Sequence, residues 1–205
     1  VAPQHAAFFK RWLGEGRQAG MAYMEGHEAK RLDPRLLVEG CRTVVSVALN
    51  YHPPTPIPDH KLQIAWYAYG QDYHDIMRQK LNSLLETLRH STPEGTLQGR
   101  AFCDSLPTQA LEEGRGLDAR RCLSYLTIEN RGGIPEEAAA RMYPYFYGCD
   151  RCLRACPHLR SAPPATEPAF TPRPELLQME EEDWMALDME RYRMLFKGSA
   201  VKRAK

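Results

Sequence analysis

Residues 149–157 read Cys149-Asp150-Arg151-Cys152-Leu153-Arg154-Ala155-Cys156-Pro157 and contain three of the six cysteines in the chain. A Cys-x2-Cys turn brings two thiolates to one ion or to one edge of a cluster, and a third cysteine followed by proline ends the bacterial ferredoxin motif. A fourth cysteine, Cys122, precedes the stretch. The pattern predicts an iron-sulfur site in which Cys122, Cys149 and Cys152 hold one cluster and Cys156 reaches a second.

The same four cysteines allow two other interpretations. An all-thiolate zinc site would use these residues in the same way, although the Cys-Pro ending favours iron and sulfide. Disulfides are less expected, because thiols stay reduced in the cytoplasm. The two remaining cysteines, Cys41 and Cys103, are expected to be small buried residues beside strands.

The overall composition is that of a soluble globular protein of one or two domains. The chain has 205 residues, and its 27 basic residues nearly balance 26 acidic ones, giving a formal charge of +1. This balance argues against a uniformly basic nucleic-acid binder, although basic residues can still gather locally. The longest apolar run, residues 44–49, is too short to cross a membrane. Because residues 1–13 also lack the charged start and apolar core of a secretion signal, we expect a cytoplasmic protein.

Hydrophobic periodicity in the first half of the chain predicts helices around a small number of strands. Short helices are expected over residues 8–38, with breaks near residues 14–16 and 33–34. Thr43–Leu49 is β-branched and nearly continuously apolar, which predicts a strand covered on both faces. Tyr73–His90 predicts a long helix with one buried stripe, and Leu97–Asp104 a second short strand. These elements indicate an α/β or α+β core.

The second half of the chain predicts short helices and a proline-rich strap. A helix is expected over residues 120–128, and another begins at Glu136, where acidic residues follow Pro135. Residues 157–174 contain six prolines and should form an extended linker or a strap over the surface.

Several blocks of the chain resemble epoxyqueuosine reductase, follow the order of that family and together span nearly the whole sequence. The blocks are Arg31-Leu32-Asp33-Pro34, Tyr67-Ala68-Tyr69-Gly70-Gln71-Asp72-Tyr73-His74, Asp118-Ala119-Arg120-Arg121-Cys122-Leu123-Ser124-Tyr125-Leu126-Thr127-Ile128-Glu129, Tyr147-Gly148-Cys149-Asp150-Arg151-Cys152 and Phe196-Lys197-Gly198-Ser199-Ala200-Val201-Lys202-Arg203.

This resemblance implies an α/β (α+β) cobalamin-binding reductase core with a ferredoxin-like iron-sulfur domain. It places the cobalamin-binding catalytic domain at residues 1–105, the ferredoxin-like domain at 106–160, and the proline-rich strap with a basic C-terminal segment at 161–205. The implied oxidoreductase reduces the epoxide of epoxyqueuosine at the tRNA wobble position to the cyclopentene of queuosine, with loss of water. Cobalamin and two 4Fe-4S clusters, fed by an electron donor protein or reductant, would deliver the electrons.

The family's proton donor falls on Asp104, whose carboxylic acid would protonate the departing epoxide oxygen. For this role the pKa of Asp104 has to be raised, most simply by burial beside the flat corrin. By residue type alone, an aspartate that caps a turn with Ser105 is the more common situation, and only the family match favours catalysis. Arg31 and Ser124 are candidate cobalamin contacts.

Basic residues near the cysteines and in the C-terminal segment could contact tRNA phosphates, while aromatic residues such as Tyr125 stack on loop bases. The basic residues are Lys197, Lys202, Arg203, Lys205, Arg120, Arg121, Arg151 and Arg154. A run of charges is more often only a solvated face, and the near-zero net charge favours a local patch.

The chain departs from the family pattern after Cys103-Asp104-Ser105. In the family, this motif is followed by a long segment that ends in a complete Cys-x2-Cys-x2-Cys-x3-Cys-Pro motif. A motif like Pro107-Thr108-Gln109-Ala110-Leu111 comes after that segment. In this chain the first and last of these motifs are almost adjacent in sequence. Either the chain has a deletion, or its 205 residues omit a mobile segment. We favour the second explanation, because a cysteine motif without iron loses the metal bonds that keep it ordered. Two all-cysteine 4Fe-4S clusters need eight thiolates and six are present, so these residues could not assemble both clusters.

Two rival functions remain at this point. A corrinoid and iron-sulfur reductive dehalogenase pairs similar cofactors with a different leaving group, but the block from Ser124 to Glu129 disfavours it. A non-catalytic electron-transfer module or a zinc-stabilised module would need only the cysteines.

Overall fold

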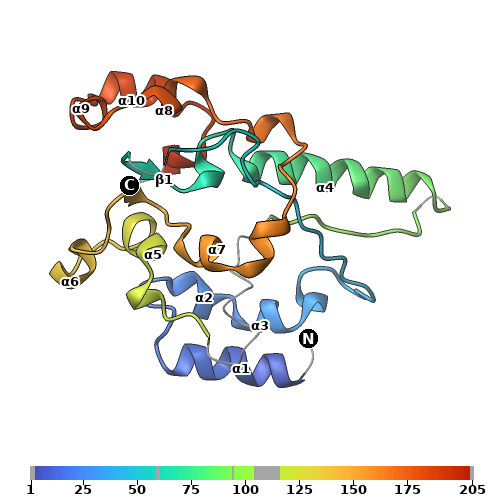
Figure 1. Cartoon of the computed structure of the whole chain (residues 1–205). Helices are drawn as coiled ribbons and strands as arrows, with labels where there is room; N and C mark the ends of the chain where they lie inside the picture. Colours follow the sequence, from blue (N-terminus) through green and yellow to red (C-terminus); the bar gives the residue numbers. More distant parts are fainter. Residues whose placement is uncertain (1–2, 59–60, 94, 104–115, 204–205) are drawn as a thin grey trace. The chain divides into compact units, whose positions relative to one another are not determined.

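The computed structural model describes residues 3–58, 61–93, 95–103 and 116–203, and helices dominate this part of the chain (Figure 1). The α-helices are α1 (Pro3–Gly14), α2 (Ala22–Gly26), α3 (Glu28–Leu32), α4 (Tyr73–His90), α5 (Leu123–Ile128), α6 (Glu136–Ala139), α7 (Arg151–Ala155), α8 (Pro174–Gln178), α9 (Glu181–Met185) and α10 (Met189–Leu195). Short 3-10 helices are η1 (Pro34–Leu36), η2 (Trp66–Ala68), η4 (Ala119–Arg121), η5 (Pro157–Ser161), η6 (Pro168–Phe170) and η7 (Ala200–Arg203). Two strands, β1 (Gln63–Ile64) and β2 (Tyr145–Tyr147), complete the elements.

The chain divides into two compact units, each built from segments that are distant in sequence. The first unit combines Val1–Ala48 with Met77–Cys122, and the second combines Leu49–Ile76 with Leu123–Lys205. No helix of the described ranges combines the length and apolarity that a membrane span requires.

The first unit begins with the short helices that the sequence predicts. Helix α1 ends at Gly14, and η1 begins at Pro34, where the Asp33 side chain accepts the backbone N–H of Arg35 at 3.0 Å. The segment before Cys122 returns to α1, because Trp12 Nε1 donates to the carbonyl of Leu117 at 2.6 Å. The breaks predicted near residues 14–16 and 33–34 are confirmed.

The two strands predicted for the first half of the chain are wrong for the described structure. Residues 43–49 form no strand, and Val44 and Val45 are 70% and 66% exposed instead of covered. Residues 97–103 also form no strand, although their exposure alternates along the segment as in a half-buried strand. A β-branched segment becomes a strand only when a neighbouring strand accepts its backbone hydrogen bonds, and neither segment has such a ladder in the described ranges.

Helix α4 has the predicted bounds, Tyr73–His90, but its apolar stripe is less buried than predicted. Ile76, Met77 and Leu81 are half-buried, while Leu84 and Leu88 are 41% and 42% exposed. The helix therefore follows its local pattern, and the stripe is only partly covered by the rest of the described chain.

The second unit is organised around a two-stranded parallel sheet. Gln63 pairs with Tyr145 and Ile64 pairs with Tyr147. Side chains from β1, η2, β2 and the C-terminal helices form one apolar core around this sheet. Its buried members are Ile64, Ala68, Tyr69, Tyr147, Leu176, Met179, Trp184, Phe196 and Val201. Sheet and core together hold the turn that follows β2, which carries the cysteines.

The proline-rich segment follows the prediction of a strap with few regular elements. It contains the short helices η5 and η6 and is tied to residues 50–52. Asn50 Nδ2 donates to the carbonyl of Pro163 at 2.8 Å, and the backbone N–H of Ala165 donates to the carbonyl of His52 at 2.8 Å.

Candidate metal centre

The cysteine turn begins at Gly148, directly after β2, and this position requires glycine. Its φ is +69°, and a Cβ atom there would lie 2.5 Å from the Cβ of Ala65. The backbone N–H of Gly148 donates to Thr127 Oγ1 of α5 at 2.9 Å. The turn is therefore fixed by close approach to the residue after β1 and by a hydrogen bond to α5.

Asp150 anchors the same turn from between Cys149 and Cys152. The residue is 3% exposed, and its carboxylate accepts the backbone N–H of Trp66 at 2.7 Å. Burial raises the pKa of Asp150 to about 6, and the hydrogen bond from Trp66 and the charge of Arg154 oppose this rise. The buried carboxylate thus holds the cysteine turn against the start of η2.

The thiols of Cys149, Cys152 and Cys156 lie on one short stretch of the second unit. Burial raises the pKa of the Cys149 thiol, whereas the backbone N–H of Arg151 lowers it. Cys152 lies on α7 and is exposed, and Cys156 follows the end of that helix. Cys122 ends the first unit, immediately after η4. Within the described ranges, no group of three or more His, Cys, Asp or Glu side chains is arranged to hold a metal ion, so the four-cysteine ligand set stays a prediction.

Partly buried aromatic residues lie near the turn. Burial raises the pKa of Tyr51 to about 12 and also raises that of Tyr67, and the nearby charge of Asp150 contributes to both. The indole Nε1 of Trp66 is buried and has no hydrogen-bond partner in the described part of the chain. Cluster sulfurs accept hydrogen bonds from such donors, and solvent exclusion adjusts cluster potentials. The residues at this turn therefore fit a 4Fe-4S cluster.

The other predicted site residues lie on different parts of the chain. Asp104 lies outside the described residues. Arg31 lies on α3 of the first unit and is half-buried. Ser124 lies on α5 of the second unit and is also half-buried. Their roles toward cobalamin stay predictions.

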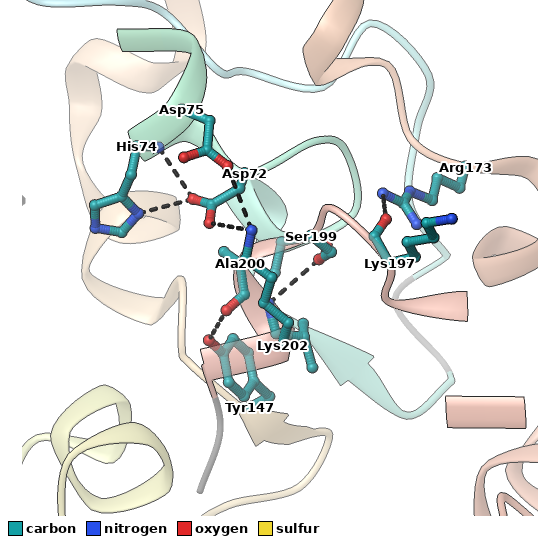
Figure 2. Close-up of polar contacts among 11 residues, drawn as sticks. Asp72, His74, Asp75, Tyr147, Arg173, Lys197, Ser199, Ala200 and Lys202 are labelled. Atoms are coloured by element: carbon teal, nitrogen blue, oxygen red, sulfur yellow. Dashed lines mark hydrogen bonds and ion pairs between the residues drawn. The ribbon is translucent and has the colours of Figure 1, made fainter. Parts of the chain in front are cut away.

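A polar cluster that the sequence analysis did not assign joins two of the sequence blocks (Figure 2). The Asp72 carboxylate is fully buried and accepts hydrogen bonds from the backbone N–H of His74 at 3.0 Å and from His74 Nδ1 at 2.8 Å. Lys202 Nζ lies 3.4 Å from Asp72 and 3.3 Å from Asp75. Ser199 Oγ, 131 residues away in sequence from Ala68, donates to the carbonyl of that residue at 3.0 Å.

This cluster changes the interpretation of the basic C-terminal segment. Lys202 was expected to be a phosphate contact, but its ammonium group is engaged by two carboxylates. Near the cysteines, Arg120 pairs with Asp118, and Arg151 donates to the carbonyl of Tyr143 at 2.6 Å. Lys197 is exposed, and Figure 2 shows its side chain extending away from the Asp72 cluster.

Residues 31–105 match the family model described as "Epoxyqueuosine reductase QueG, DUF1730", and residues 103–158 match "4Fe-4S double cluster binding domain". The epoxyqueuosine reductase of Cellulophaga algicola is 31% identical over 264 residues, covering 98% of this chain and 86% of that relative. The Escherichia coli epoxyqueuosine reductase is 29% identical, covering 94% of this chain and 68% of that protein. Because 264 exceeds the 205 residues of this chain, the first alignment includes positions that the relative has and this chain lacks.

Solved structures agree on the fold. An epoxyqueuosine reductase crystallised with a tRNA-Tyr epoxyqueuosine-modified stem loop matches 98% of this chain and 70% of its own, with a TM-score of 0.68 and 17% identity. The Bacillus subtilis epoxyqueuosine reductase matches 84% of this chain and 63% of its own, with a TM-score of 0.59 and 19% identity. The predicted mixed helix and sheet fold with an iron-sulfur domain is confirmed. The chain belongs to the epoxyqueuosine reductase family and is an oxidoreductase with a 4Fe-4S cluster-binding domain.

Proposed function

We propose that this chain reduces epoxyqueuosine to queuosine at the wobble position of a tRNA, with Asp104 as the proton donor and cobalamin as the group that meets the substrate. The observation that carries the proposal is the cysteine turn at residues 148–152, which is shaped by a required glycine, anchored by a buried carboxylate and lined by aromatic residues in a member of this family. A 4Fe-4S cluster and cobalamin, when bound, supply electrons at potentials that no side chain reaches.

The chain's own residues would hold these groups and move the proton. Cys122, Cys149, Cys152 and Cys156 are the proposed cluster ligands, and Arg31 and Ser124 the proposed cobalamin contacts. Residues 1–105 would form the catalytic domain, residues 106–160 the iron-sulfur domain, and residues 161–205 the strap and basic segment. The Bacillus subtilis relative was captured with an aspartate-bearing catalytic loop swung out of its active site, which supports a catalytic aspartate here.

The tRNA is the proposed substrate because a structural neighbour was crystallised with a stem loop that carries epoxyqueuosine. Single-turnover reduction of such a stem loop, after anaerobic reconstitution with iron, sulfide and cobalamin, tests the proposal. We expect queuosine to form in the wild-type chain and its rate to fall by about 10²-fold or more in Asp104→Asn, because that variant has no acidic proton to donate. Full activity of Asp104→Asn would overturn the assignment of Asp104. The surface variant Asp183→Asn is the matched control.

A further inference from the structure

Two buried hydrogen-bond donors next to the cysteine turn have no acceptor among the residues that the structure describes. They are the hydroxyl group of Tyr145 on β2 and the indole Nε1 of Trp66 in η2. A buried donor without an acceptor costs free energy, so it is kept mainly where it has a role or where an ion completes the bond. Resting on the cluster ligands of the proposed function, we propose that Tyr145 and Trp66 donate hydrogen bonds to sulfur atoms of the iron-sulfur cluster and so set its reduction potential.

Tyr145 lies on the inner face of the strand that leads into the turn. It is 3% exposed and shares this face of β2 with Tyr147, since both are buried while Phe146 between them is exposed. The two hydroxyl groups differ in their acceptors. That of Tyr147 donates to the carbonyl of Ala200 at 3.0 Å (Figure 2). The core therefore uses the proton of the Tyr147 hydroxyl, whereas the Tyr145 hydroxyl still has its proton to donate.

The Tyr145 hydroxyl lies within electrostatic reach of the first cysteine of the turn. Burial raises the pKa of this hydroxyl, Asp150 raises it further, Arg154 lowers it, and the nearby thiolate of Cys149 adds to the rise. Arg154 cannot take the hydroxyl proton, because a guanidinium group only donates. The Asp150 carboxylate is bonded instead to the backbone N–H of Trp66. A cluster held at Cys149 brings sulfur atoms that accept hydrogen bonds to this place.

Trp66 is held against the turn by contacts of its backbone and of its ring. Its backbone N–H donates to the Asp150 carboxylate at 2.7 Å, and the guanidinium carbon of Arg154 lies 5.5 Å from its ring centroid. The ring of His52 stacks on the indole with centroids 5.6 Å apart, and His52 Nδ1 lies 3.1 Å from a carbonyl of the proline-rich segment. The indole is therefore fixed beside α7, the helix that carries Cys152, with its N–H already buried.

Both donors favour the reduced form of the cluster. Each electron that enters adds negative charge, and a hydrogen bond to a charged acceptor is stronger than one to a neutral acceptor. Hydrogen bonds to the sulfur atoms are one of the means by which a protein sets the potential of such a cluster. Because the hydroxyl and the indole N–H are buried, water competes little for them. We therefore expect each donor to raise the reduction potential.

The test is a potentiometric titration of the anaerobically reconstituted full chain, followed through the EPR signal of the reduced cluster. Tyr145→Phe and Trp66→Phe each remove one donor and keep an aromatic ring in its place. Both variants should bind iron at the wild-type level. Their ratio of reduced to oxidised cluster at a fixed potential should fall by about tenfold, which is a shift of about 59 mV for one electron. A midpoint potential equal to that of the wild type would overturn the assignment of the residue concerned.

Two substitutions in the same unit are matched controls. Trp184 also has a buried Nε1 without an acceptor in the described ranges, but its ring packs on Phe146 and Phe196 in the core. The Tyr192 hydroxyl donates to the carbonyl of Val201 at 2.8 Å. Trp184→Phe and Tyr192→Phe should keep the wild-type potential. A shift as large as in the donor variants would overturn the proposal, because the change would then not depend on donors at the turn.

A second readout uses the wild-type chain and does not depend on the variants or on turnover. With ¹⁵N at the indole nitrogens and ¹³C at the tyrosine Cζ atoms, pulsed EPR of the reduced cluster should show a coupling to each label. Absence of the ¹⁵N coupling would overturn the assignment of Trp66, and absence of the ¹³C coupling that of Tyr145.

Failure of the proposed function would show differently. A chain that holds the cluster with both couplings but forms no queuosine would overturn the proposed function and leave this inference standing. A reconstituted wild-type chain that holds no cluster would overturn both.

Discussion

The carboxylate of Asp150 accepts the backbone N–H of Trp66 at 2.7 Å across 84 residues of sequence. This one hydrogen bond joins the Cys149-x2-Cys152 turn to the segment that continues through Tyr67 and Tyr73 to His74. The metal centre and the polar cluster around Asp72 are thereby parts of one packed unit.

The raised pKa of Asp150 predicts that the stability of the chain depends on pH. Its pKa is about 6 in the folded chain and 3.8 in the reference state, so the folded state binds a proton more readily than the unfolded state. The contribution of such a group to stability is highest below pH 3.8, falls as the pH rises toward 6, and is constant above pH 6. At neutral pH the buried charge costs about 3 kcal/mol.

Asp150→Asn removes this charge and keeps an oxygen that can accept from Trp66. We expect the variant to be more stable than the wild type at pH 7, by up to about 3 kcal/mol, and to lose this advantage near pH 4. Urea unfolding of the metal-free chain between pH 4 and 7.5 measures the difference. A gap between the two proteins that does not change with pH would contradict the assignment.

Gly148→Ala should destabilise the cysteine turn, because it adds a Cβ atom 2.5 Å from Ala65 Cβ at a positive φ. We expect a loss of about 2 kcal/mol or more and reduced iron binding. Gly133→Ala is the control, since a Cβ atom there has nothing within 4 Å. Equal stability of the two variants would show that the close approach to Ala65 is relaxed in solution.

Substitution of Lys202 should affect stability, whereas substitution of Lys197 should affect tRNA binding. Lys202→Ala removes one cation from beside the buried Asp72 and should cost about 1 to 2 kcal/mol, since Lys202 itself is partly exposed. Lys197→Ala should leave stability unchanged but reduce the salt dependence of tRNA binding by about one phosphate contact. Denaturant unfolding and stem-loop titrations at several salt concentrations measure the two effects. The interpretation would be wrong if Lys197→Ala lowered stability and Lys202→Ala instead reduced the salt dependence of tRNA binding.

The cysteines predict the iron content. Cys149→Ser, Cys152→Ser and Cys156→Ser should each reduce bound iron, whereas Cys41→Ser should not, because the Cys41 thiol donates to the carbonyl of Thr43 at 3.5 Å outside the turn. With the six cysteines of its 205 residues, the wild-type chain should bind fewer than the eight irons of two complete clusters, since two all-cysteine clusters need eight thiolates. Iron and sulfide analysis after anaerobic reconstitution measures both, and about eight irons per chain would refute the count.

Local patterns in the sequence predicted the elements that depend on local interactions. Helix α4, the start of α6 after Pro135 and the Cys149-x2-Cys152 turn follow from spacing and capping within a few residues. The strand predicted over residues 43–49 is wrong because strand formation depends on a partner that no local pattern contains. Strands β1 and β2 are only two and three residues long, too short for an alternation to be visible.

The Asp72 cluster was missed for a related reason. Its two sides come from residues 72–75 and 197–202, and nothing in the local sequence of either predicts that Lys202 meets Asp72. The only indication was that both segments lie in blocks that resemble one family. Asp72, as an aspartate just before a helix, looks like an ordinary cap, and its complete burial becomes visible only in the folded chain.

The central claim is that this chain converts epoxyqueuosine to queuosine. The most direct measurement is nucleoside mass spectrometry of tRNA from a bacterium that lacks its own epoxyqueuosine reductase and expresses this chain. We expect queuosine to replace epoxyqueuosine, and Asp104→Asn expressed at the same level to leave epoxyqueuosine in place. Epoxyqueuosine that persists with the wild-type chain, at the level of the empty vector, would contradict the claim.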